Sequence, residues 1–372
     1  MEKKTNRLYF IDAMRAWAIL MMLQGHFIDG LLDFEYRDKT ILPYAIWSYF
    51  RGMTAPVFFT VSGFIFTYLL VKGNKIGLKN PRVKKGIKRG LQLILIGYLL
   101  RMNLFSVLFA ELYDSFYYVD VLHCIGFSIL GIIALYLLTS KTKPIVFATI
   151  LLCITLVLFL YEPSYDKLPH TYLPKAIANY ITKLYGSVFT IIPWFGYATF
   201  GAFMAMLFTK FKNYKHLYLT AILICTTLGL FLIFGSSPMF AFICDVTGSN
   251  FLYAVYTNNY LFIRLGDVLI IFSLFMMLRS FLTNKVVLRI GQNTLAIYVI
   301  HFIILYGSFT GLGIYHYLKY SLHPATAIIG AILFMISCTY LALLYDTYED
   351  KIKATLQKIK LGVLKLFRLA KN

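Results

Sequence analysis

The feature that most constrains this chain is a series of ten apolar stretches, each about 20 residues long, that recur along its whole length. A helix of that length crosses the ~30 Å hydrocarbon core of a bilayer. Only 14% of the residues are charged and 59% are hydrophobic, so lipid is the solvent that suits these stretches. We therefore predict an all-α, polytopic transmembrane bundle of about ten helices, with spans at 8–31, 46–71, 87–108, 119–139, 144–161, 184–209, 217–235, 260–282, 288–308 and 323–345.

Basic residues alternate with the predicted spans. If the N-terminus lies inside the cell, 26 of the 36 Lys and Arg residues fall in cytoplasmic segments and eight in outer segments. Cytoplasmic loops of membrane proteins carry such an excess, so we predict that both termini are cytoplasmic. The net charge of +20 then belongs to one membrane face, which favours anionic membrane lipid as a partner and excludes a nucleic-acid-binding protein.

No linker or low-complexity segment divides the chain. We predict one transmembrane domain over residues 1–345 and a basic tail over 346–372. The tail has one apolar helical face, formed by Ile352, Leu356, Ile359, Val363 and Phe367. A helix of this pattern lies in the membrane interface, so we expect an amphipathic cytoplasmic tail that acts as an anchor.

The five cysteines favour neither a disulfide framework nor a zinc site. Four of them lie far apart within predicted spans, and Cys244 stands alone in a loop. Because no set of residues has metal-ligand spacing, we predict no metal cofactor.

The first span carries an unusual number of ionisable side chains. Asp12, Arg15, His26 and Asp29 are spaced so that they share one helical face. Charged groups are unfavourable in hydrocarbon, so this face is expected to point into the bundle, and each residue is a candidate functional group. At ~1.5 Å per residue, His26 and Asp29 lie toward the outer surface, whereas Asp12 and Arg15 lie toward the cytoplasm.

His26 and Asp29 form the first catalytic hypothesis. An aspartate one turn away can fix the imidazole tautomer and leave the second ring nitrogen free as a general base. The alternative is that His26 only forms an interhelical hydrogen bond. Polar side chains at the outer ends of other spans indicate that several helices share one hydrated cavity with this pair; they are Arg101, Asp120, His123 and His301.

The cytoplasmic half suggests a different role. Arg15 and Asn293, together with the basic loop 72–89, could meet an anionic ligand that enters from inside. The alternative for Asp12 and Arg15 is an internal ion pair that holds helices together.

Five segments, taken in order, give the chain a family resemblance. They are RLYFIDAMRAWAILMMLQGHF (7–27), APVFFTVSGF (55–64), YVDVLHCIGFS (118–128), IIPWFGYATFGAF (191–203) and GQNTLAIYVIH (291–301). The first resembles the opening helix of the heparan-alpha-glucosaminide N-acetyltransferase-like family and of its relatives in acyltransferase family 3, although Ala16 stands where that family usually has Gly. The resemblance spans nearly the whole chain.

This resemblance implies that residues 1–345 form a membrane acyltransferase domain, with acetyl-CoA as the acyl donor. The acyl group would pass to an acceptor on the outer side, a carbohydrate or glycolipid, with a histidine as base or acyl carrier. His26 is the first candidate because it lies in the matched motif, and His123 and His301 match less distinctive positions. Asp12, Arg15, Asn293 and Arg101 would bind the donor, and Arg101 or Asn103 could also stabilise an oxyanion.

Several alternatives stay open. Direct transfer and an acyl-histidine intermediate are equally compatible with these residues. A transporter or channel with a His- and Asp-lined pathway is the main rival, and a structural or sensory membrane protein is the third. We expect a multi-pass protein of the bacterial cytoplasmic membrane, as a monomer or a homodimer.

Overall fold

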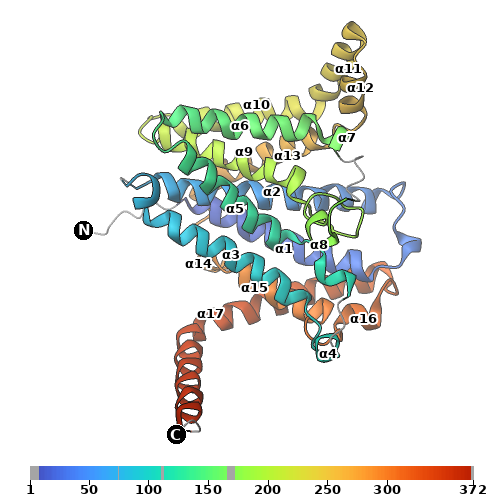
Figure 1. Ribbon diagram of the computed structural model, residues 1–372. Coiled ribbons are helices and arrows are strands. Elements are labelled where there is room, and N and C mark those ends of the chain that lie inside the picture. Colours follow the sequence, from blue (N-terminus) through green and yellow to red (C-terminus); the bar gives the residue numbers. More distant parts are fainter. Residues whose placement is uncertain (1–7, 74, 110–112, 166–171, 370–372) are drawn as a thin grey trace.

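The computed structural model describes residues 8–73, 75–109, 113–165 and 172–369, and all regular elements within them are helices. Most of these helices run along one direction and form a bundle (Figure 1). The predicted all-α polytopic bundle is therefore confirmed. We call the end of the bundle at which α1 begins the near end, and the opposite end the far end. Five basic residues of the charge pattern lie outside the described residues; they are Lys3, Lys4, Arg7, Lys167 and Lys371.

Ten helices or helix pairs of the described chain correspond to the predicted spans. They are α1 (Tyr9–Leu31), α2 (Leu42–Val71), α3 (Pro81–Arg101), α5 (Val121–Leu138), α6 (Pro144–Leu160), α9 (Ile191–Lys210), α10 (Leu217–Leu230) with α11 (Ser236–Thr247), α13 (Tyr260–Met277), α14 (Lys285–Gln292) with α15 (Thr294–Tyr306), and α17 (Pro324–Leu369). Short elements connect them: η1 (Phe34–Tyr36), η2 (Gly77–Lys79), α4 (Leu104–Leu108), η3 (Asp114–Tyr117), α7 (Glu162–Tyr165), α8 (Lys175–Ala178), η4 (Phe231–Gly235), α12 (Asn250–Thr257), η5 (Leu278–Ser280) and α16 (Ile314–Leu318).

Length and apolarity alone support fewer crossings than ten. Among the described residues, six helices are long and apolar enough to cross a membrane, and the bent pair α14–α15 makes a seventh. α6 is apolar but has only 17 residues. α1 and α3 are long enough but carry several ionisable side chains. Those of α1 are the candidate functional residues, and those of α3 are mainly basic residues of its first half. The orientation of the bundle in the membrane stays a prediction.

Three predicted boundaries were wrong. The span predicted at 87–108 is α3, which ends at Arg101 because Met102 is extended, and α4 is a separate short helix. The span predicted at 184–209 begins only at Ile191, since Gly186 has a φ of 100° that no helix contains. The span predicted at 217–235 continues through the π-helical turn η4 into α11 and ends at Thr247.

The span predicted at 288–308 is broken. α14 and α15 meet at Asn293 with a bend of 70°. Gly291, just before the break, packs so closely on α1 that an added Cβ would lie 1.9 Å from the carbonyl oxygen of Asp12. The break therefore lets α14 rest directly on the first turn of α1.

The last span and the tail form one helix, α17, which continues without interruption from Pro324 to Leu369. Figure 1 shows that its C-terminal part turns across the bundle direction at the near end, the end where α1 begins. This course is the one expected of a helix in the membrane interface. Of the predicted apolar face, only Ile352 is among the described side chains.

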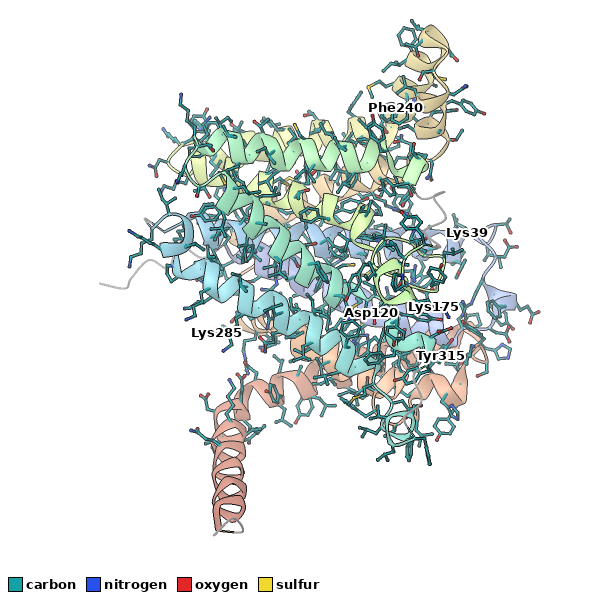
Figure 2. All side chains as sticks on the ribbon, viewed as in Figure 1. Lys39, Asp120, Lys175, Phe240, Lys285 and Tyr315 are labelled. Atoms are coloured by element: carbon teal, nitrogen blue, oxygen red, sulfur yellow. The ribbon has the colours of Figure 1, made fainter. Side chains whose placement is uncertain are left out.

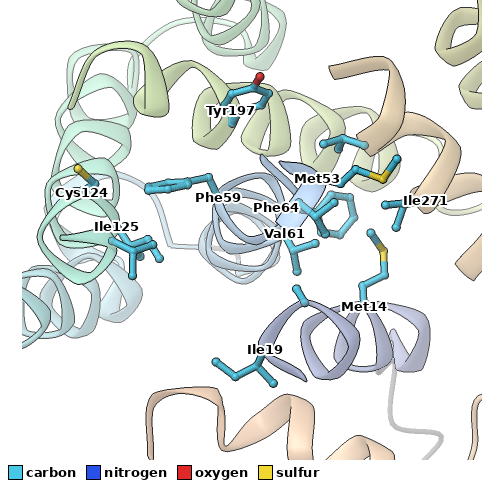
Figure 3. Packing of buried hydrophobic residues seen from close by; sticks show 14 of the residues in the cluster. Met14, Ile19, Met53, Phe59, Val61, Phe64, Cys124, Ile125, Tyr197 and Ile271 are labelled. Carbon is cyan, nitrogen blue, oxygen red and sulfur yellow. The ribbon is translucent and has the colours of Figure 1, made fainter. Parts of the chain in front are cut away.

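The core lies where α1, α2, α9 and α13 meet. Figure 3 shows Met14 of α1 pointing toward Val61 and Phe64 of α2, with Tyr197 on the opposite side of α2. α2 and α9 approach most closely through glycines, because a Cβ on Gly63 or Gly201 would lie about 2 Å from a backbone oxygen of the other helix. These contacts hold the inner helices rigidly around the far-end cavity described next.

Candidate active site

A cavity of about 580 Å³ opens between the helices toward the far end. Its walls come from the last turns of α1, the N-terminal half of α2, the end of α3, the start of α5, the start of α9, and α15 with the loop 307–311. The volume is within the range of small-molecule sites. Figure 2 shows Asp120, one of its lining residues, on this side of the molecule, whereas Lys285 marks the near end.

His26 lines this cavity and has a defined partner. Its Nδ1 atom is hydrogen-bonded to the hydroxyl of Tyr306, at 2.7 Å. The ring of His301 lies behind it, with centroids 5.3 Å apart. His301 is fully buried, does not line the cavity, and neither of its ring nitrogens has a hydrogen-bond partner among the described residues. His26 is thus the histidine that a reactant in the cavity would meet.

The predicted pairing of His26 with Asp29 is wrong. Asp29 forms an ion pair with Arg51 of α2, and His26 takes Tyr306 instead. The two residues share a face of α1, but a guanidinium satisfies a carboxylate better than an imidazole does. Arg51 lines the cavity with half of its side chain exposed, so Arg51, paired with Asp29, forms part of the rim beside His26.

Asp120 and His123, which lie three residues apart in the sequence, form a helix cap. The backbone N–H of Asp120 donates to Nδ1 of His123, at 3.1 Å, within a capping box at the start of α5. His123 is fully buried beneath Tyr98 and does not line the cavity. The Asp120 carboxylate pairs with Arg101 Nη2 at 2.8 Å, and both of these residues reach the cavity wall.

Four polar atoms on the cavity wall are buried and lack a hydrogen-bond partner among the described residues. They are the Trp194 Nε1–H, the Thr54 hydroxyl, the Ser308 hydroxyl and the Arg101 Nε–H. Buried polar groups are almost always paired in folded proteins. The four residues line one cavity, but the four atoms themselves are covered, so a polar ligand would complete their hydrogen bonding only after these side chains shift.

The loop that closes the cavity has an unusual backbone. Gly307 ends α15 with a φ of 70°, and Phe309 follows with a φ of 73°, which is rare for a side chain other than glycine. Two hydrogen bonds hold Phe309 in place: its N–H donates to the Met102 carbonyl, and its carbonyl accepts from the Leu104 N–H, both at 2.9 Å. The strain lies at the cavity wall, where function most often stores it.

Outside the spans, Lys175 donates to both carboxylate oxygens of Asp114, at 2.9 and 3.1 Å, and these hydrogen bonds raise the pKa of Lys175. The pair ties α8 to η3, whose Ser115 lines the cavity. No three His, Cys, Asp or Glu side chains within the described ranges are grouped so that they could hold a metal ion.

Comparison with known families agrees with this arrangement. Residues 7–246 match the family model described as heparan-alpha-glucosaminide N-acetyltransferase, catalytic. The chain belongs to this family. A search of curated proteins found no match. Membership in this acetyltransferase family and the apolar helices together identify a multi-pass membrane acetyltransferase.

The match to the acetyltransferase family covers four of the five resembling segments and ends before 291–301. It includes His26, Asp29, Arg101 and His123, whereas His301 lies beyond it. α15 and the loop 307–311, which also line the cavity, lie outside the matched region and are assigned to the site by geometry alone.

The near end of α1 is built differently. Arg15 donates to the Thr294 hydroxyl at 2.9 Å and lies 3.8 Å from Asp12. Asn293 sits at the α14–α15 break and donates to the Arg289 carbonyl. Asp12, Arg15 and Asn293 thus lie at the near end of α1, whereas Arg101 lies at the far end.

Sequence reasoning missed several lining residues. Arg51 and Tyr306 lie in segments that look like ordinary interfacial or lipid-facing sequence. An arginine at the outer end of a span offered some indication for Arg51, because charges there are rare unless paired. Nothing in the sequence distinguishes Tyr306 from the other 28 tyrosines.

Proposed function

We propose that the protein transfers an acetyl group from acetyl-CoA to a sugar hydroxyl or amine in the far-end cavity, with His26 as general base. The observation that carries the proposal is the position of His26. It lines the cavity and is held through Nδ1 by Tyr306, whereas neither His123 nor His301 reaches the cavity.

The tautomer of His26 follows from its proposed role as general base. A base at Nε2 requires that Nδ1 carry the proton and donate it to the oxygen of Tyr306. The hydroxyl hydrogen of Tyr306 is then free to turn toward the cavity. Tyr306 orients the imidazole in this scheme, while the Asp29–Arg51 pair beside it contributes charge to the rim.

The chemistry needs only these groups. His26 Nε2 takes the proton of the acceptor as its oxygen or nitrogen attacks the thioester carbonyl. The tetrahedral intermediate expels the thiolate of coenzyme A, which takes the proton from the imidazolium. We assign the stabilisation of the oxyanion to Arg101 and the side-chain amide of Asn103, since both residues line the cavity.

The unpaired polar atoms support a sugar as the acceptor. Trp194, Thr54 and Ser308 each offer a buried group without a partner among the described residues, and aromatic rings of Phe58 and Phe189 stand beside them. Once these side chains shift to expose the polar atoms, a ring with several hydroxyls would satisfy them and stack on the aromatic faces.

The near-end residues support an anionic donor. Arg15 stands with Asp12 and Asn293 on the side to which the basic loops belong, and eleven residues of helix, ~16 Å, separate it from His26. An extended pantetheine arm would bridge this separation while the coenzyme A phosphates stay near Arg15. The basic tail of α17 would hold this end on anionic lipid.

The test is acetyl transfer by purified protein from labelled acetyl-CoA to methyl glucosaminide and methyl glucoside, with products identified by mass. We expect His26→Ala to lower turnover by ~10²–10⁴-fold, as for loss of a general base. His316→Ala is the matched control, because His316 is exposed and does not line the cavity. Full turnover by His26→Ala, or none by a folded wild type, would contradict the proposal.

A further inference from the structure

The short helix α4 and the residue after it expose an apolar surface. Leu104, Phe105, Val107, Leu108 and Phe109 are between 47% and 79% exposed. α4 has only five residues and lies beyond the end of α3, so it cannot itself be a span. Exposed apolar patches of this kind mark contact with a membrane or a partner.

The surroundings of α4 favour the membrane. On α3, the preceding span, Leu91, Leu95 and Leu99 form an exposed stripe at helical spacing that leads toward α4. In Figure 1, α4 lies at the far end on the periphery of the bundle, away from the central helices. The patch thus continues the exposed apolar stripe of α3 beyond the end of that helix.

The same segment is part of the cavity wall. Met102 and Asn103, which lead into α4, line the cavity together with Phe309. Backbone hydrogen bonds join Phe309 to Met102 and to Leu104, the first residue of α4, and the Asn103 side chain accepts from Phe105 N–H at 2.9 Å. The position of α4 is therefore coupled to the position of the cavity wall through these backbone hydrogen bonds.

We propose that α4 with Phe109 inserts into the membrane leaflet at the far end, and that the acceptor is a sugar carried on a lipid. The insertion fixes the cavity wall at the lipid–water boundary, where an amphiphile presents its headgroup while its chain stays in the leaflet. The acceptor class rests on the proposed function, whereas the insertion stands without it.

Insertion is tested without activity. Phe109→Trp, in vesicles that contain brominated lipid, should be quenched beyond the signal of the three native tryptophans. Lys39→Trp serves as the solvent-side control, because Lys39 is exposed in a far-end loop (Figure 2) and the indole placed there should be quenched by iodide in the water. If the indole introduced by Phe109→Trp is quenched by iodide alone, or by neither agent, insertion is overturned; protection from both would indicate that protein covers α4.

The acceptor class is tested with two acceptors that share one headgroup, hexadecyl glucosaminide and methyl glucosaminide, in the same vesicles. The wild type should prefer the hexadecyl form. Replacing Phe105, Leu108 and Phe109 with Ser should lower kcat/KM for that form by about tenfold and leave the methyl form unchanged. The matched control replaces Phe242, Val246 and Tyr253, equally exposed apolar residues of α11 and α12, and should change neither rate.

Equal loss on both acceptors, or no loss on either, overturns the lipid-linked acceptor. If the wild type acetylates neither sugar, the proposed function fails, and the quenching result still decides whether α4 is inserted.

Discussion

The two ends of α1 carry similar residues in very different surroundings. At the near end, Arg15 has a partner in Thr294, and Gly291 packs directly on the backbone of Asp12. At the far end, His26 lines a cavity whose wall holds several polar atoms without partners among the described residues. Ionisable groups in a span can therefore stabilise packing or await a ligand, and their hydrogen-bond partners distinguish these roles better than their identity does.

The difference extends to the helices that meet α1. α14 breaks at Asn293 so that its last turn rests on α1, which leaves little free space at that contact. α15 ends instead at Gly307 in a loop that stands away from α1 and encloses the cavity. This helix pair thus packs tightly on the first turn of α1 with one half and lines the far-end cavity with the other.

The largest expected effect comes from the buried ion pair at the far end. Asp120→Ala leaves the Arg101 charge without its counterion, and both side chains are less than 15% exposed. We expect a loss of ~3–5 kcal/mol in the free energy of unfolding, measured by thermal unfolding in detergent. Asp114→Ala removes the partner of Lys175 in an exposed pair and should change stability by ~0–1 kcal/mol. Equal effects would show that the far-end pair is not buried.

The near-end contact should be sensitive to a single methyl group. Gly291→Ala forces a Cβ against the Asp12 carbonyl, and we expect a destabilisation of ~1–3 kcal/mol in the same unfolding assay. Gly73→Ala is the control, since nothing lies within 4 Å of its added Cβ. A stable Gly291→Ala variant would contradict close packing at this end.

The hydrogen bond between Tyr306 and His26 should affect the rate of the reaction and not the stability of the fold. Tyr306→Phe removes the hydrogen bond to His26, so kcat should fall by up to about tenfold while KM for acetyl-CoA stays unchanged. Tyr315→Phe, whose ring touches that of Tyr306 but not His26, should retain full activity. If Tyr306→Phe keeps the wild-type kcat, the hydroxyl does not orient the base.

The smallest effect compares two threonines. Thr54→Val removes an unpaired hydroxyl at the cavity, so stability should hold while KM for the sugar rises by about fivefold, ~1 kcal/mol. Thr294→Val removes the acceptor of Arg15, so stability should fall by ~1–3 kcal/mol with KM for the sugar unchanged. A loss of stability in Thr54→Val, together with a raised KM for the sugar in Thr294→Val, would contradict the distinction between the two ends.

Much of this arrangement was predictable from the sequence. Apolar length predicts the bundle, and the shared face of Asp12, Arg15, His26 and Asp29 predicts that α1 points its polar side inward. The outer cavity with His26 and Arg101 also follows from helix depth. The residues that contact His26 could not be predicted in this way. Arg51 and Tyr306 lie 25 and 280 positions from His26, and only the packing of the helices brings them beside it. The break at Asn293 depends on a contact with α1 that no local pattern encodes.

The most direct test measures kcat and KM for acetyl-CoA in His26→Gln and Arg15→Gln side by side, with methyl glucosaminide as acceptor. The account predicts that His26→Gln loses kcat by ~10²–10⁴-fold while it still binds acetyl-CoA. Arg15→Gln should keep its kcat and raise KM for acetyl-CoA, since it lies at the opposite end of α1. A normal kcat in His26→Gln, with turnover abolished at saturating acetyl-CoA in Arg15→Gln, would contradict the assignment of chemistry to the far end.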